Sequence, residues 1–127
     1  MSKRILILDN DPGILDVMQD ILHYEGFEVK AISDTDNIFK NITDYKPDLV
    51  MLDYLLDGIN GGELCAQIKK NPSTSEIPVV IISAYSRVLL SLGLYGCDVF
   101  IAKPFELNDF VEKITVLSGH EFNSPVY

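Results

Sequence analysis

The chain has 127 residues, of which 47% are hydrophobic and 23% are charged, and this is the balance of an ordinary globular protein. A chain of this length forms one domain and buries roughly two-thirds of the surface that its unfolded state exposes, so it folds without disulfide or metal support. Its net charge of −9 argues against direct nucleic-acid binding by this domain, because that binding requires a basic surface.

The start of the chain and its cysteines indicate a cellular compartment. Lys3 and Arg4 are followed by only four apolar residues before Asp9, which is too short for a signal peptide. No apolar run reaches the length that spans a membrane. Cys65 and Cys97 form no metal-ligand spacing with the histidines, so we interpret them as small buried thiols. These features predict a cytoplasmic protein that does not bind membranes.

Short apolar runs alternate with helical stripes along the chain. Asp11 and Pro12 are typical of a helix start, and we interpret Asp11 as the helix cap in preference to a metal ligand. This first helix is predicted to end at Gly26. Ser33 and Asp34 predict the start of a second, shorter helix. Three further helices are predicted, one ending at residue 70, a weaker one at 86–94 and one at 106–117. The predicted strands cover residues 4–8, 27–32, 49–52, 77–82 and 99–102.

Five strands that alternate with five helices predict a parallel sheet, since parallel neighbours are joined by right-handed helical crossovers. The expected architecture is α/β, a flavodoxin-like (βα)5 doubly wound domain with helices on both faces of a five-stranded sheet. Residues 54–62 contain two turn signals and are predicted to form a loop. No periodic pattern follows residue 118, so residues 1–118 are predicted as the folded domain and residues 119–127 as a frayed tail.

Four polar residues directly follow four of the apolar runs. They are Asp9, Asp53, Ser83 and Lys103. Ligands of an open α/β sheet bind in the crevice beyond the carboxyl ends of its strands, so we expect these side chains to converge there. Alone, each would be interpreted as a cap, a turn residue or a surface lysine. Together, two carboxylates, a hydroxyl and an ammonium can hold a divalent cation and a phosphoryl group.

The expected chemistry is phosphoryl transfer. Asp53 is placed to act as a nucleophile toward phosphorus and form an acyl phosphate. Asp9 adds a second carboxylate, which favours a cation between the two, and Mg²⁺ suits such oxygen ligands. Ser83 can donate its hydroxyl to a phosphoryl oxygen, and Lys103 can neutralise the phosphoryl charge. A cis peptide bond between Lys103 and Pro104 would turn the lysine back into the crevice.

At these motifs the chain resembles the receiver domain of two-component response regulators, the CheY-like superfamily. The resemblance covers about residues 3–117, with its landmarks in order at residues 8–9, 47–61, 82–84 and 96–105. It implies that Asp53 takes a phosphoryl group from a sensor histidine kinase or a phosphotransfer protein. It also implies a signalling domain that catalyses only its own phosphotransfer and dephosphorylation.

The resemblance assigns the metal site as well. Asp9 and Asn10 match the family's paired acids, which hold Mg²⁺ together with Asp53 and the backbone carbonyl of Leu55. The second acid is usually Asp or Glu, so Asn10 removes one formal charge from the site. We therefore expect weak Mg²⁺ binding. The same departure leaves open a degenerate receiver whose partner binding ignores phosphorylation.

The remaining roles concern the phosphoryl group and the switch. Ser83 and Lys103 match the residues that grip the phosphoryl group, and the backbone amide of Ala84 is implied to assist. Phe100 matches the aromatic residue that turns inward when the hydroxyl residue moves. This movement would reshape the face formed by the fourth helix, the fifth strand and the fifth helix, which we expect to bind a downstream effector or a second copy of the chain. The apolar residues that crowd this region are Leu89, Leu90, Leu92, Leu94 and Tyr95.

A second class of function starts from the segment Asp9–Asn10–Asp11. It looks like the Asp-x-Asp motif of haloacid-dehalogenase-type phosphatases, with Asp9 as the nucleophile and Asp11 as the acid. Pro12 stands where that motif has Thr or Val, no acidic pair follows Lys103, and the chain is short for a cap domain. The receiver interpretation is therefore favoured.

Overall fold

The computed structural model describes residues 2–56, 58, 60–85 and 96–119. The weaker helix predicted at residues 86–94 lies outside the described residues. So do its apolar side chains Leu89, Leu90, Leu92 and Leu94, together with Tyr95 and all but the first residue of the predicted tail.

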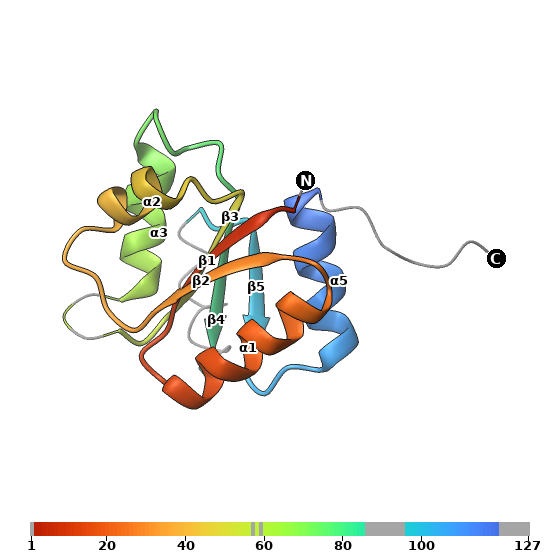
Figure 1. Cartoon of the computed structure of the whole chain (residues 1–127). Helices are drawn as coiled ribbons and strands as arrows, with labels where there is room; N and C mark the ends of the chain where they lie inside the picture. The colour runs from red at the N-terminus through yellow and green to blue at the C-terminus, as the bar shows by residue number, and fades with distance from the viewer. Residues whose placement is uncertain (1, 57, 59, 86–95, 120–127) are drawn as a thin grey trace.

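The described part of the chain forms one parallel sheet of five strands with four helices. Figure 1 shows how these elements are arranged. The strands are β1 (Arg4–Leu8), β2 (Glu28–Ile32), β3 (Leu49–Asp53), β4 (Val79–Ser83) and β5 (Val99–Ala102). The helices are α1 (Pro12–Tyr24), α2 (Ile38–Tyr45), α3 (Gly61–Lys70) and α5 (Leu107–Ser118). The strand order β2-β1-β3-β4-β5 reverses direction next to β1, as in a doubly wound fold. The predicted flavodoxin-like class is confirmed.

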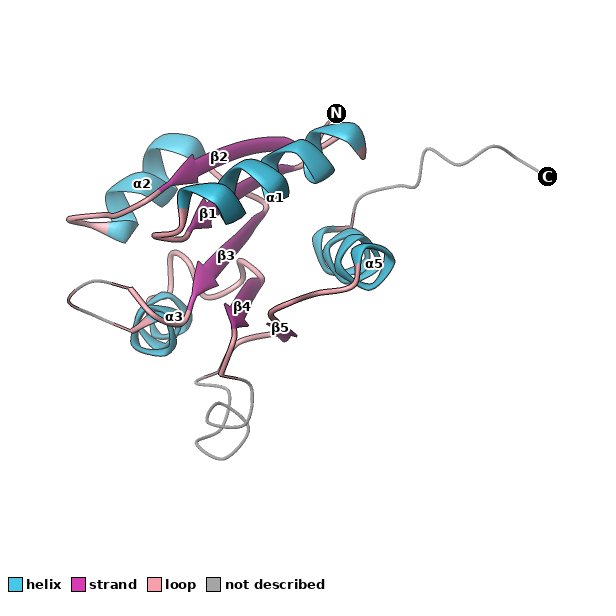
Figure 2. Ribbon diagram, turned by 90° about the horizontal axis from the view of Figure 1, so that it is seen from below, coloured by secondary structure: helices cyan, strands magenta, loops and turns pink. Residues whose placement is uncertain are grey.

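Two apolar layers hold the sheet in place. Helices α1 and α5 cover one face, and α2 and α3 cover the other (Figures 1 and 2). Strand β3 lies at the centre and is buried along its whole length, including Asp53 at its end. Such a strand is apolar on both faces because both faces are covered by helices. No helix within the described ranges is long and apolar enough to cross a membrane.

The strand register aligns the ends of four strands. Leu8 of β1 pairs with Leu52 of β3, and the next residue of β3, Asp53, pairs with Ile82 of β4. Ser83 in turn pairs with Ala102, the last residue of β5. Because the strands are parallel, the residues that end or follow them emerge at the same edge of the sheet.

The predicted start of the second helix was wrong. Residues 33–37 form a connection, and α2 begins only at Ile38. The cap is Asn37, whose side-chain oxygen accepts hydrogen bonds from the backbone amides of Phe39 and Lys40 at 3.0 and 3.3 Å. Upstream, the Thr35 hydroxyl accepts a hydrogen bond from the Asn37 amide, which favours a turn over an earlier helical start.

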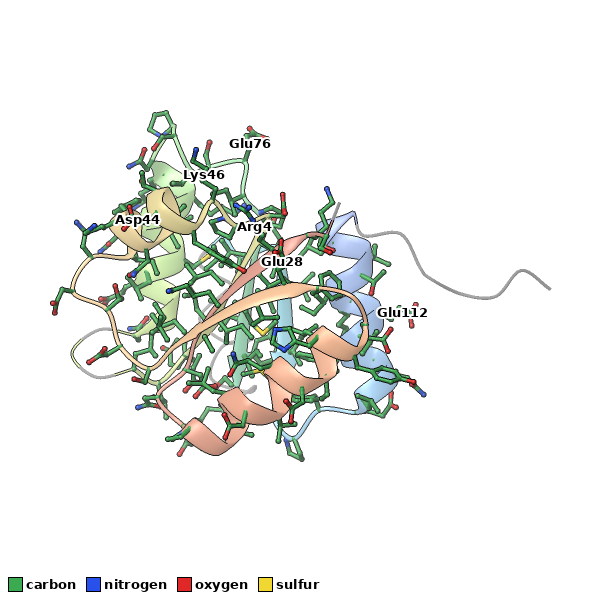
Figure 3. The ribbon with its side chains drawn as sticks, in the orientation of Figure 1. Arg4, Glu28, Asp44, Lys46, Glu76 and Glu112 are labelled. Carbon is green, nitrogen blue, oxygen red and sulfur yellow. The ribbon has the colours of Figure 1, made fainter. Side chains whose placement is uncertain are left out.

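A cluster of charged residues lies at the opposite end of the strands, where β1, β2 and β3 begin. Figure 3 shows Arg4 and Glu28 there, and the Arg4 Nε lies 3.6 Å from a Glu28 carboxylate oxygen. The Arg4 backbone amide donates to Asp48 at 2.8 Å, and its guanidinium donates to the Tyr45 carbonyl at 3.1 Å. These bonds join the starts of β1, β2 and β3, so we assign this cluster to the fold.

Candidate functional site

The structure brings both predicted carboxylates to one lysine. Asp9 follows β1 and is 1% exposed, and Asp53 ends β3 and is 8% exposed. The Lys103 Nζ lies 2.9 Å from Asp9 Oδ2 and 3.4 Å from Asp53 Oδ1. The Lys103–Pro104 peptide bond is cis. Residues 94 and 50 positions apart in the sequence therefore meet at a single charged centre.

This centre changes the proton affinity of Asp53. Burial is the main cause that raises the pKa of Asp53 above its ordinary value, and the like charge of Asp9 adds to it. The Lys103 ammonium and the backbone amide of Leu55 act in the opposite direction. The carboxylate is thus only partly compensated, and further positive charge would stabilise its ionised form.

Hydrogen bonds to Asp9 and Asp11 hold the loop between β1 and α1. Asp9 Oδ1 accepts a hydrogen bond from the Asp11 backbone amide at 2.9 Å, while its Oδ2 faces Lys103. Asp11 Oδ1 accepts from the amides of Gly13 and Ile14 at 3.0 and 3.3 Å. The predicted role of Asp11 as the α1 cap is confirmed.

A cavity of about 250 Å³ opens beside the lysine. It is lined by Asn10, Asp11, Asp53, Leu55, Ser83, Ala84, Tyr85 and Lys103. Ser83 is 1% exposed, and its Oγ accepts a hydrogen bond from the Tyr85 backbone amide at 2.9 Å. The oxygen-rich wall of the cavity suits Mg²⁺, which prefers hard oxygen ligands. Of the predicted residues, Asp9 does not line the cavity, and Phe100 packs elsewhere, against the apolar layer under α2 and α3.

Sequence reasoning missed the feature that fixes the backbone of Asp53. The Gly61 amide donates to the Tyr54 carbonyl at 2.8 Å, which packs the start of α3 against the end of β3. A Cβ atom at Gly61 would lie 2.2 Å from the Asp53 carbonyl oxygen. The Asn60–Gly61–Gly62 turn signal was visible in the sequence, but a turn signal does not reveal which backbone the glycine approaches. Tyr85 was also missed, and no local signal distinguishes it.

The sequence matches the family model of the response regulator receiver domain over residues 5–115. This chain belongs to the response regulator receiver family. A relative of this receiver is the DNA-binding response regulator MtrA of Mycolicibacterium smegmatis, 32% identical over 116 residues. That match covers 90% of the receiver chain and 50% of MtrA, so the chain spans about half the length of the curated relatives it matches.

Solved structures agree with the family. The response regulator TrrA of Thermotoga maritima, crystallised in complex with Mg²⁺ and BeF, has a TM-score of 0.81 and 29% identity, covering 91% of this receiver and 98% of TrrA. A CheY-like response regulator receiver domain protein of Methanospirillum hungatei has a TM-score of 0.79 and 29% identity, covering 94% and 95% of the two chains. The predicted receiver fold and family are confirmed.

Proposed function

We propose that this receiver accepts a phosphoryl group on Asp53, with Mg²⁺, and uses it to change a partner-binding surface. The observation that carries the proposal is the Lys103 Nζ between Asp9 and Asp53, beside a cavity that Ser83 and Ala84 also line. The donor is a phosphohistidine of a sensor histidine kinase or a phosphotransfer protein. Apart from its own phosphotransfer and dephosphorylation, the domain has no proposed enzymatic activity.

The reaction is an in-line displacement at phosphorus. A carboxylate oxygen of Asp53 forms the new P–O bond while the P–N bond to the donor histidine breaks, and the histidine nitrogen keeps the electron pair and takes a proton. Lys103 stabilises the charge on the phosphoryl oxygens, and the Ser83 hydroxyl and the Ala84 amide donate to them. Bound Mg²⁺ supplies further charge neutralisation at the transferring oxygens.

The metal site would consist of Asp53, the Asn10 amide oxygen and the Leu55 carbonyl, with the charge of Asp9 close behind. An amide oxygen ligates Mg²⁺ but brings no negative charge. Asn10→Asp is therefore expected to tighten Mg²⁺ binding about tenfold, since opposite charges at about 4 Å attract by roughly 4 kcal/mol at an effective dielectric of 20 before desolvation is subtracted. Isothermal titration of both proteins measures this difference, and equal affinities would contradict it.

The switch would act through Ser83 and Phe100. The Ser83 hydroxyl accepts a hydrogen bond from the Tyr85 backbone amide at 2.9 Å. Turning this hydroxyl toward a phosphoryl group would replace the Tyr85 amide with a phosphoryl oxygen as its partner. Phe100 is half-buried on β5 and would move into the space released. These changes would reach the face of β5 and α5, where a groove of about 310 Å³ is lined by Val99, Asp109, Glu112, Lys113, Val116 and Leu117. We propose this face, together with the helix that the sequence predicts at residues 86–94, as the docking surface for an effector or a second copy.

The proposed setting is the cytoplasm, without membrane contact. MtrA, the relative named above, is called a DNA-binding response regulator, and the match covers only 50% of its length. With a net charge of −9, this domain itself is not proposed to contact DNA.

Asp53→Asn is expected to abolish phosphorylation, because an amide cannot act as the nucleophile. Wild type and variant are incubated with acetyl phosphate and Mg²⁺, and with a cognate kinase, and the added phosphoryl group is measured by intact mass and mapped by peptide mass. Asp16→Asn, at an exposed position of α1, is the matched control and should react like wild type. A wild-type protein that gains no phosphoryl mass with either donor would favour the degenerate receiver, and phosphate on Asp9 of the Asp53→Asn protein would revive the phosphatase alternative.

A further inference from the structure

The cavity beside Asp53 presents an unexpected pair of carboxylates. Asp11 and Asp53 line it, whereas Asp9 does not. Both oxygens of Asp9 are already engaged, Oδ1 by the Asp11 amide and Oδ2 by Lys103. Asp9 is also 1% exposed, so a hydrated cation in the cavity has no direct access to its carboxylate.

Asp11 has one carboxylate oxygen to spare. Its Oδ1 accepts from the amides of Gly13 and Ile14, while among the described residues its Oδ2 has no hydrogen-bond or ion-pair partner. The side chain is exposed on the same wall as Asn10. The loop between β1 and α1, which carries Asp11, leaves the sheet at the edge where β3 ends (Figure 2).

We propose that Asp11 is a further cation-binding residue, which holds the hydrated Mg²⁺ through its free oxygen and supplies the negative charge that Asn10 lacks. This inference rests on the proposed function. Mg²⁺ dehydrates reluctantly and keeps several of its waters in protein sites, so a carboxylate on the cavity wall can bind it through a water molecule. Within the described ranges no three His, Cys, Asp or Glu side chains gather at one point that could hold a metal. In this proposal Asp11 therefore contacts the ion through water and not as one of three direct carboxylate ligands.

The test separates the charge of Asp11 from its role as a cap. Asn caps a helix about as well as Asp, so Asp11→Asn removes the carboxylate and keeps the cap. Asp16→Asn makes the same change of net charge at an exposed position of α1 away from the cavity. Mg²⁺ dissociation constants are measured by isothermal titration and by amide chemical shifts. Asp11→Asn is expected to weaken Mg²⁺ binding about tenfold, and Asp16→Asn by less than about twofold.

A second variant, Asp11→Ser, keeps the cap with a different side chain and should show the same weakening. Equal Mg²⁺ affinities for Asp11→Asn and Asp16→Asn would overturn this inference and leave the proposed metal site standing. A wild-type protein that binds no Mg²⁺ at millimolar concentrations would overturn both. Because the readout is cation binding, it does not depend on the identity of the phosphoryl donor.

Discussion

Replacing Gly61 with alanine is expected to lower the free energy of unfolding by about 3 kcal/mol and to slow phosphorylation of Asp53 about a hundredfold. The added Cβ would lie 2.2 Å from the Asp53 carbonyl oxygen and 2.9 Å from its carbonyl carbon. Backbone cannot swing aside as a flexible side chain does, so either α3 or the end of β3 has to move. Urea unfolding measures the first effect, and mass-detected phosphorylation at fixed donor and Mg²⁺ concentrations measures the second.

Gly13→Ala is the matched control, since Gly13 also lies in the first turn of a helix. The nearest atom to its added Cβ is Asp11 Oδ1 at 3.4 Å, which is ordinary contact. This variant should keep wild-type phosphorylation and gain up to about 1 kcal/mol of stability, because alanine restricts the unfolded chain. Equal unfolding free energies and equal rates for the two variants would show that the approach of Gly61 to Asp53 does not constrain the site.

The fold was predictable because its signals are local and repeated. Apolar runs on both faces define β1, β3 and β4, and the Asp11–Pro12 start of α1 combines a side-chain cap with proline at the first helical position. The error at the second helix has the same local origin. Ser33, Asp34 and Asn37 are all good caps, and only the bonds that Asn37 makes to Phe39 and Lys40 select among them.

The residues of the site were predictable only as a set placed at one edge. Parallel strands explain why Asp9, Asp53, Ser83 and Lys103 meet, and the register confirms their alignment. The orientation of these side chains could not be predicted from the sequence. The engagement of both Asp9 oxygens, which leaves Asp11 on the cavity wall, depends on a backbone amide and a lysine 94 positions away.

Lys103→Met is expected to destabilise the protein by about 3 kcal/mol at pH 7, because it leaves two buried carboxylates without their shared counter-charge. The lysine is 16% exposed and lies 2.9 and 3.4 Å from Asp9 and Asp53. Its loss removes an interaction that lowers the pKa of Asp53, so that already raised pKa rises further. A carboxyl whose pKa is raised in the folded state binds its proton more tightly there than in the unfolded chain, so the protonated form favours folding at low pH. As pH rises and the carboxyl ionises, this contribution is lost and the folded state is destabilised. The deficit of Lys103→Met should therefore grow as pH rises from about 4 to 7.

The control for this effect is Lys113→Met, which breaks the ion pair with Asp109 on α5. That pair is 2.8 Å long, but its side chains are 39% and 49% exposed, so water already screens it. We expect a loss below about 0.5 kcal/mol, with little change between pH 4 and 7, when both variants are unfolded in urea across that range. A pH-independent deficit for Lys103→Met, or equal losses for the two lysines, would mean that the Lys103 ammonium does not balance the charge of Asp9 and Asp53. In the expected case, added Mg²⁺ should restore part of the stability of Lys103→Met, since a bound cation replaces the missing charge and binds only the folded site.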